Sequence, residues 1–520
     1  MTKNGKFLQA ENLYAFLGGC ILSDGRKVRD AFRLVGKVSL WDCLSSYLIL
    51  YRFPLCIHAD DDKFYSYKDR VRPILGTLSN IYDTFISPPK YTKSGLDERL
   101  IREGANGILL LGFNEPHFRD VLRSVYSAIK IDASLYKPIV LTSTREWKYE
   151  ESHLSVWDCF SDEVISDVAH ALGLVGKLKQ DMLHMITTNC CKSTEFLIDW
   201  DLVKLELSWI CNKEVPRLIY LAASVNEILT RYIPSLIILA DDADQRSKLV
   251  ELAARKAGIP SLVIQQGYAI AAYPDWRHFA GDYVASMSSA SLEIIVEQGV
   301  PRQAVTITGH PGFDKLKNVS QQDILATRAA LGIGKHHFFL LFATQPYVLG
   351  AFESEEARDR IIKVVCETAS SIKGVILVVK AHPYDNVPRL KRLCKHCKNV
   401  KVVDSKTEIA DLIKACDIFM TMFSQATLEA LYADKPVINI KFPEILVSSP
   451  FYDGKATLVL RTNEEIKSEI VNICSGNSTF FSDPHTQISK REMLSNWVYL
   501  PDGMATDRVV SLTKKILKHH

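Results

Sequence analysis

The fold of this chain is decided by the stretch Val375–Leu431, whose two most telling parts read VILVVKAHP (375–383) and IFMTMFSQATLEAL (418–431). Each part begins with an apolar run of strand length and continues into a turn that carries polar side chains. The first turn holds His382 ahead of a proline, and the second, at 423–427, is rich in hydroxyl and amide groups and opens a helix. Because free backbone N–H groups at a helix start favour an anion, the stretch predicts a diphosphate-sized site at the carboxyl edge of a parallel sheet.

Apolar runs alternate with amphipathic segments on both sides of this stretch, which is typical of βαβ units and a parallel sheet. In a first series, strands are predicted at 217–221, 236–240, 261–265 and 283–286, with helices at 244–257 and 289–297. In a second series, strands are predicted at 338–342, 375–379, 400–403, 418–420 and 436–440, with helices at 353–371 and 406–416. A last helix is predicted at 505–518.

Residues 1–210 are harder to divide into elements. Strand-like runs lie at 55–59, 107–111 and 138–142. They either extend the first sheet or form a separate domain, and we expect one sheet with helical insertions.

Length, charge and cysteine content limit the kind of protein. A chain of 520 residues is too long for one core, and 63 basic against 60 acidic residues argue against nucleic acid as the main ligand. Of twelve cysteines, only Cys394 and Cys397 form a C-x-x-C, which has no second pair, and Asp60–Asp62 is best explained as a solvated turn, so no metal is expected. Unpaired cysteines and the lack of a long apolar run predict a cytoplasmic protein, with peripheral contact to the inner face of the membrane left open.

Five short motifs follow one another in a fixed order between about residues 230 and 510. They read IQQGY (264–268), VTITGHPGFD (305–314), KAHP (380–383), SQATLEA (424–430) and DGMATDR (502–508). In this order they resemble the GT-B superfamily of surface and capsular polysaccharide glycosyltransferases. That superfamily is related to UDP-N-acetylglucosamine 2-epimerases and CDP-glycerol glycerophosphotransferases.

The resemblance implies an α/β fold of GT-B type. Two Rossmann-like domains with parallel sheets would face each other across a cleft, and a C-terminal helix would pack back. We expect an acceptor domain with helical insertions at 1–315, a nucleotide-sugar-binding domain at 325–500 and a crossing helix at 501–520. An interdomain hinge is expected near 310–335.

The resemblance also implies a nucleotide site in the second domain. His382 and Pro383 would lie at the diphosphate, with the imidazole donating to a phosphate oxygen, and Glu429 would accept hydrogen bonds from the ribose hydroxyls. The other residues implied to donate to the phosphates or flank the cleft are Thr344, Gln345, Ser424, Gln425 and Thr427. Such donors stabilise a nucleotide leaving group, so no cofactor beyond the nucleotide-sugar co-substrate is expected.

Two departures separate the chain from the epimerases. Their Asp-Ser-Gly-Gly turn is replaced by Phe423–Ala426, and Glu429 stands where two acids are usual. Their His-x-Glu-Ala-Gly segment is replaced by QQGYA at 265–269, which lacks an acid for proton transfer. The Gln-Gly pair looks more like the transferases of surface polysaccharide synthesis.

Group transfer to a hydroxyl needs a base, and the best candidates follow the strand at 236–240. Asp241 and Asp242 stand where a parallel sheet presents ligands, although adjacent acids there also serve as a helix cap and turn device. We expect His278 to take part in catalysis as well.

The acceptor is expected to contact the first domain near these acids. Gln266, Gly267, Asp275 and Arg277 are the acceptor-binding candidates, with a surface loop as the alternative interpretation of the segment that holds Asp275 and Arg277.

The predicted function is transfer of a sugar from a nucleotide sugar to a glycan or lipid-linked acceptor in surface polysaccharide synthesis. The alternatives are a UDP-N-acetylglucosamine 2-epimerase-type enzyme, a CDP-glycerol-type glycerophosphotransferase and a non-catalytic subunit of a polysaccharide assembly complex. The expected partners exclude nucleic acid, and a homo-oligomer is left open.

Overall fold

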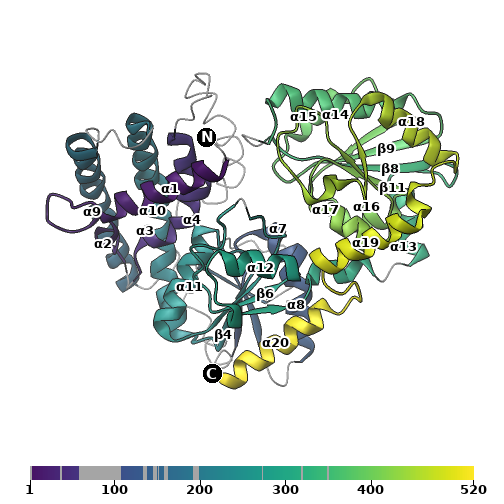
Figure 1. The fold of residues 1–520 in the computed structure, drawn as a ribbon. Coiled ribbons are helices and arrows are strands. Elements are labelled where there is room, and N and C mark those ends of the chain that lie inside the picture. Colours follow the sequence, from purple (N-terminus) through teal and green to yellow (C-terminus); the bar gives the residue numbers. More distant parts are fainter. Residues whose placement is uncertain are drawn as a thin grey trace. The chain divides into compact units, whose positions relative to one another are not determined.

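The computed structural model describes residues 3–35, 38–57, 107–132, 137–143, 149, 152–156, 162–190, 198–271, 273–317, 320–347 and 351–520. These residues form two compact units (Figure 1). The first unit holds the described residues up to Gly312 together with Thr506–His520, and the second holds Phe313–Ala505. The acidic run Asp60–Asp62 lies outside the described residues.

A seven-stranded parallel sheet forms the centre of the first unit. Its order is β3-β2-β1-β4-β5-β6-β7. The strands are β1 (Ile108–Leu111), β2 (Pro138–Thr142), β3 (His153–Ser155), β4 (Leu236–Leu239), β5 (Ser261–Ile264), β6 (Tyr283–Ser286) and β7 (Val305–Ile307). The runs at 107–111 and 138–142 therefore extend the first sheet, as one of the two alternatives predicted, while β3 and β7 were not predicted.

Helices cover this sheet and form a separate layer beside it, where α1, α9 and α10 lie together (Figure 1). The α-helices are α1 (Lys3–Gly19), α2 (Val28–Ala31), α3 (Leu40–Cys43), α4 (Ser45–Tyr47), α7 (Glu115–His117), α8 (Arg123–Ile131), α9 (Asp162–Met185), α10 (Trp200–Arg231), α11 (Gln245–Ala257) and α12 (Ser289–Glu297). The first unit also contains short π and 3-10 segments, at Leu48–Arg52, Phe53–Cys56, Phe118–Leu122, Ile186–Cys190 and Arg302–Ala304.

Two of the predicted strands are wrong. Residues 217–221 lie inside the 32-residue helix α10, whose buried residues include Leu218, Ile219 and Leu221. A short apolar run in a helix that is buried on several sides has the same pattern as a buried strand. In the run at 55–59, residues 55 and 56 belong to a 3-10 turn and Ile57 forms only an isolated bridge with Ile198, while residues 58 and 59 lie outside the described residues.

The C-terminal helix α20 (Ala505–His519) packs back on the first sheet, as expected. Val509, Leu512 and Ile516 join the cluster formed by Ile108 of β1 and Tyr126 of α8, among others. The chain therefore returns from the second unit to complete the core of the first.

The second unit is a six-stranded parallel sheet with order β10-β9-β8-β11-β12-β13, with helices on both faces (Figure 1). The strands are β8 (Phe338–Ala343), β9 (Val375–Lys380), β10 (Val400–Val403), β11 (Ile418–Thr421), β12 (Val437–Ile440) and β13 (Leu458–Leu460). The helices are α13 (Gln321–Ala330), α14 (Glu355–Ser370), α15 (Val387–Leu393), α16 (Ile409–Ala415), α17 (Ala426–Tyr432), α18 (Asn463–Cys474) and α19 (Pro484–Trp497), with 3-10 turns at Pro311–Leu316, Pro450–Asp453 and Phe480–Ser482. All five strands predicted here are confirmed, and β13 was not predicted.

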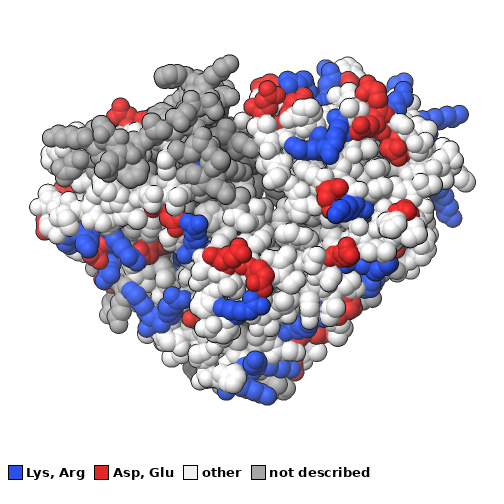
Figure 2. Space-filling view, viewed as in Figure 1, with Lys and Arg blue, Asp and Glu red and all other residues white. Residues whose placement is uncertain are grey.

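The charges on the surface are mixed, in keeping with the nearly equal numbers of basic and acidic residues in the sequence. On the face shown in Figure 2, basic and acidic side chains are interspersed. Within the described residues, no helix combines the length and the apolarity needed to cross a bilayer.

Replacing Ile516 by alanine should lower the free energy of unfolding by about 2 to 5 kcal/mol, because the side chain is 2% exposed and leaves a cavity in the core that α20 completes. Denaturant titration measures this change. The neighbouring exposed Lys515→Ala should change the free energy of unfolding by less than about 0.5 kcal/mol. Equal effects of the two substitutions would contradict the packing of α20 described here.

Candidate functional site

A tight turn follows β9 at 382–385, and we call it the His382 turn. The backbone N–H of His382 donates to Oδ2 of Asp385 (3.0 Å) and to Oγ1 of Thr344 (3.3 Å). The backbone N–H of Tyr384 donates to Nδ1 of His382 (3.2 Å). Pro383 is exposed within the turn. The turn lies at the carboxyl edge of the second sheet, where a parallel sheet presents its ligands.

The imidazole of His382 is neutral at physiological pH. Burial lowers the pKa of His382 to about 4, and the positive charges of Lys380 and Arg358 act in the same direction, whereas Asp385 opposes them. Because Nδ1 accepts a hydrogen bond, the single ring proton of the neutral tautomer lies on Nε2. The ring therefore offers one N–H donor without having to take up a proton.

Asp385 holds this turn through a buried ion pair. The side chains of Asp385 and Arg358 are 3% and 4% exposed, and Nη2 of Arg358 pairs with Oδ1 of Asp385. The same guanidinium donates from Nε to the carbonyl of Gln345 (2.9 Å) and from Nη1 to Asp359 (3.0 Å). Sequence reasoning missed Asp385, although its position three residues after His382 is the spacing of a side chain that closes a turn.

Gln345 connects the end of β8 to the turn before α17. In the amide orientation that satisfies its hydrogen bonds, the side-chain oxygen accepts from the backbone N–H groups of Phe423 (3.0 Å) and Ser424. The structure therefore brings together the His382 turn, Thr344, Gln345 and Ser424, four of the places where the resemblance implies nucleotide contacts.

The remaining candidates lie on α17 and the turn before it. Ser424 Oγ accepts from the backbone N–H of Ala426 (3.2 Å), and Gln425 and Glu429 are half-buried. Thr427 differs from the expectation, because it is fully buried and its hydroxyl donates to Oδ1 of Asn439 in β12 (3.1 Å). Thr427 thus anchors α17 to the sheet rather than facing a ligand.

In the first unit, Asp241 follows β4 and serves two purposes. Its Oδ1 accepts from the backbone N–H groups of Ala243 (2.8 Å) and Asp244 (3.3 Å), which is the turn device considered above. Its Oδ2 lies 3.4 Å from Nδ1 of His117, a residue that sequence reasoning missed because it reaches Asp241 from α7, more than 100 positions earlier in the chain. Burial raises the pKa of Asp241, and His117 opposes this effect.

Asp275 interacts with the same group of charges. Burial raises the pKa of Asp275 to about 7, and the negative charge of Asp241 adds to this effect. When two carboxyl groups repel one another in this way, one of them keeps its proton up to near neutral pH. Such pairs are found in active sites that transfer protons.

Asp242 has the contacts of a residue that supports the fold. It is buried, its Oδ2 pairs with Nζ of Lys248 (3.2 Å), and its Oδ1 accepts from the backbone N–H of Ala280 (3.3 Å). Burial and the charge of Asp242 raise the pKa of the adjacent Glu251 well above its usual value, while Lys248 lowers it. Lys248 also donates to the carbonyl of His278, so this buried cluster fixes the loop that carries the candidate residues.

The other first-unit candidates are held by contacts within the unit. Arg277 pairs with Glu11 of α1, and Nε2 of His278 lies 3.5 Å from the same carboxylate. Both contacts lower the pKa of Glu11, the contact with His278 having the larger effect, while burial acts in the opposite direction.

The Gln-Gly turn is held through its backbone. Nε2 of His310 lies 3.1 Å from the carbonyl of Gln266, and the carbonyl of Gly267 accepts from Nε2 of Gln265 (2.7 Å). Within the described residues, no group of three or more His, Cys, Asp or Glu side chains is placed to hold a metal ion.

The substitution Asp385→Ala should lower the free energy of unfolding by about 3 kcal/mol, the lower end of the range for breaking a buried ion pair, because the buried guanidinium of Arg358 loses one of its two carboxylate partners and keeps only Asp359. Chemical denaturation measures the change. The matched control is Asp411→Ala, which removes a surface ion pair with Lys414 in which Asp411 is 53% exposed, and it should cost less than about 1 kcal/mol. A loss for Asp385→Ala as small as the control's would contradict the role given to this pair.

Comparison with solved structures finds chains that are similar to this one along most of their length. The chain resembles a protein assigned as a UDP-N-acetylglucosamine 2-epimerase from Listeria monocytogenes, at 12% identity and a TM-score of 0.51 over 80% of this chain and 97% of that one. The S. aureus MnaA–UDP structure matches at 12% identity and a TM-score of 0.49, over 79% and 97% of the two chains. A glycosyltransferase from Rickettsia africae matches at 13% identity and a TM-score of 0.45, over 80% and 99%. A search of curated protein sequences gives no match.

A model of a known sequence family matches part of the chain. Residues 274–446 match the family described as CDP-Glycerol:Poly(glycerophosphate) glycerophosphotransferase. This segment begins just before Asp275 and includes the His382 turn and α17. The fold predicted from the five motifs is thereby confirmed: the chain has an α/β fold of GT-B type, which it shares with the Listeria monocytogenes protein. In sequence, residues 274–446 are similar to the glycerophosphotransferase family, one of the groups that the predicted resemblance includes.

Proposed function

We propose that this protein transfers a group from a nucleoside-diphosphate-activated donor to an acceptor hydroxyl in the synthesis of a surface polysaccharide. The observation that supports this most is the neutral imidazole of His382, whose Nε2 proton is left as a donor by the hydrogen bond at Nδ1. A donor fixed in this way at the carboxyl edge of a parallel sheet suits the diphosphate of a nucleotide sugar or a CDP-alditol.

In this proposal, the second unit binds the donor. Nε2–H of His382 donates to a phosphate oxygen, and groups of Ser424 and Gln425 donate to the same phosphates. Glu429 accepts from the ribose hydroxyls. Gln345 is a positioning residue, because its side chain holds the backbone of Phe423 and Ser424.

The first unit supplies the base and binds the acceptor, a glycan or a lipid-linked glycan. The acceptor oxygen forms the new bond, and its proton passes to the carboxylate of Asp275, whose pKa of about 7 suits a base at neutral pH. The bond to the nucleotide phosphate breaks, and its electron pair leaves with the phosphate oxygen, where the developing charge is stabilised by the donors of the second unit. Asp241 keeps the pKa of Asp275 high through its negative charge.

Two transferred groups are compatible with such a site. A glycosyltransferase breaks the bond between the sugar carbon and the distal phosphate, so that a nucleoside diphosphate leaves. A glycerophosphotransferase breaks the bond between the two phosphates, so that a nucleoside monophosphate leaves, and the family match over 274–446 favours this second reaction. Epimerisation is disfavoured by the segment QQGYA at 265–269, which has no acid for proton transfer.

The nucleotide product identifies the reaction. We expect the protein to release CMP from CDP-glycerol, or UDP from a UDP-sugar, only when a hydroxyl acceptor is present, as measured by chromatography of the products. His382→Ala should lower kcat/KM about 100-fold or more, because it removes one preorganised donor at the leaving phosphate. The exposed His396→Ala, which lies outside the site, should leave kcat/KM unchanged. Release of an epimerised sugar without acceptor would overturn the proposal, and so would full activity in His382→Ala.

The pH dependence reports the base. Because Asp275 acts as a carboxylate, kcat/KM should rise as the pH increases through about 7 and then level off, and Asp275→Asn should remove nearly all activity. Asp275→Asn should also raise the melting temperature at pH 8. The pKa of Asp275 is higher in the folded than in the unfolded state, so the folded wild-type protein loses stability as the pH rises from about 4 to about 7. The amide side chain of the variant does not ionise, so the variant does not lose this stability. The surface variant Asp132→Asn should change neither the rate nor the profile. A profile that is flat between pH 6 and 8 in the wild type would rule out this base.

A further inference from the structure

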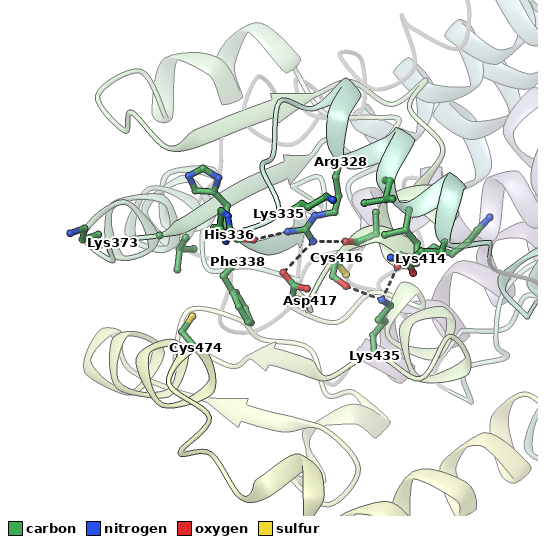
Figure 3. A pocket seen from close by; sticks show the side chains of 17 residues that line it. Arg328, Lys335, His336, Phe338, Lys373, Lys414, Cys416, Asp417, Lys435 and Cys474 are labelled. Carbon is green, nitrogen blue, oxygen red and sulfur yellow. Dashed lines mark hydrogen bonds and ion pairs between the residues drawn. The ribbon is translucent and has the colours of Figure 1, made fainter.

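A pocket lies at the edge of the sheet of the second unit that is opposite to the His382 turn (Figure 3). It is formed where β8 and β9 begin, at Phe338 and Val375, and by the segment that leads into β11 at Asp417. Its volume is about 760 Å³, which is within the range of small-molecule sites. The His382 turn lies at the carboxyl edge of the same strands, so this pocket is distinct from the site proposed above.

The lining of this pocket is strongly basic. It includes five Lys or Arg side chains and two histidines, but only one carboxylate, that of Asp417. Oδ2 of Asp417 already accepts from the backbone N–H of Phe339 (2.6 Å) and lies 3.3 Å from Nη1 of Arg328. The charge of the pocket is therefore positive even though the whole chain is nearly neutral.

Some of these cations serve the fold. Arg328 donates to the carbonyl of Ala415 (3.0 Å), and Nζ of Lys435 donates to the carbonyls of Lys414 (2.7 Å) and Cys416 (2.9 Å) at the end of α16 (Figure 3). Cations commonly stabilise the carbonyl groups at the C-terminus of a helix in this way. These residues explain the floor of the pocket without any ligand.

The other basic side chains that line the pocket have no such explanation. Lys335, His336, His337 and Lys373 are exposed, and their side chains make no hydrogen bond or ion pair within the part of the chain that the structure describes. Like charges around one cavity repel one another, and an anion bound between them would relieve this repulsion.

The wall beside the rim is apolar. Ile324 and Leu325 of α13 line the pocket, and Leu325 is 41% exposed. Ammonium groups next to an apolar wall suit a phosphate group, which pairs with the ammonium groups, and the wall can cover an organic part where the ligand has one.

We propose that this pocket binds a phosphate-bearing ligand with two or more negative charges, held by Lys335, Lys373 and the two histidines. The phosphate belongs either to a free phosphate compound or to the headgroup of an anionic lipid. The binding chemistry is the same in both cases.

Cys474 makes the pocket directly observable. It lines the cavity and is exposed, whereas the other cysteines that the structure describes as free are buried or half-buried. Burial and the charge of Asp417 raise the pKa of the Cys474 thiol, and a bound phosphate adds further negative charge and covers the sulfur. Binding should therefore slow alkylation of this one thiol.

The experiment measures the rate at which iodoacetamide alkylates Cys474 in the full chain, by mass spectrometry of the peptide that contains it. We expect millimolar pyrophosphate to slow alkylation at least fivefold relative to potassium chloride of equal ionic strength. In a second arm, vesicles of phosphatidic acid in phosphatidylcholine are compared with phosphatidylcholine alone. Protection by pyrophosphate supports a free phosphate compound, and protection by the anionic vesicles alone supports a lipid headgroup.

Variants locate the effect. K335Q/K373Q should abolish protection, while K363Q/K391Q, which removes two exposed charges of the same unit outside the pocket, should retain it. His382→Ala should also retain protection, which separates this site from the proposed donor site. The proposal is overturned if neither pyrophosphate nor anionic vesicles slow alkylation of the wild type, if K335Q/K373Q is protected equally well, or if His382→Ala abolishes the effect.

Discussion

The buried ion pair between Asp385 and Arg358 is the constraint on which the site of the second unit depends. One carboxylate oxygen pairs with the guanidinium, and the other accepts the backbone N–H of His382. Since the same guanidinium donates to the carbonyl of Gln345, one charged group fixes the ends of both β8 and β9. Buried ion pairs contribute little net stability, but they make alternative geometries costly because a charge would then be buried without its partner. A binding site for a diphosphate requires donors that are held in one geometry in this way.

In the proposed site, the residues assigned to the phosphates suit a diphosphate whatever group is attached to it. The donors proposed at His382 and in the turn before α17 would reach oxygen atoms that a UDP-sugar and CDP-glycerol have in common. The choice between attack at the sugar carbon and attack at phosphorus therefore has to come from groups that orient the acceptor oxygen. In this chain the candidates lie in the first unit. They are Asp241 after β4, Asp275 after β5, and His117 at the end of α7.

Sequence periodicity predicted the strands that are short, apolar and bounded by Gly, Pro or Asp, as at 236–240 and 375–379. It failed at 217–221, because a helix such as α10 that is buried on several sides presents the same apolar run as a buried strand. The position of His382 could be predicted, since a histidine between a strand and a proline stands at the edge of the sheet. The partners Arg358 and His117 could not, because only the folded chain brings them to Asp385 and Asp241 from distant helices.

The pKa values of the two proposed sites are shifted in ways that divide the chemistry between them. Burial among positive charges lowers the pKa of His382 to about 4, so near neutral pH it is a hydrogen-bond donor that neither gains nor loses a proton. Burial beside Asp241 raises the pKa of Asp275 to about 7, so this carboxyl exchanges protons in that same range. A histidine is the usual residue for proton transfer at neutral pH. Here the carboxyl group of Asp275 has the matched pKa, and in the proposed function His382 serves as a hydrogen-bond donor to the phosphate.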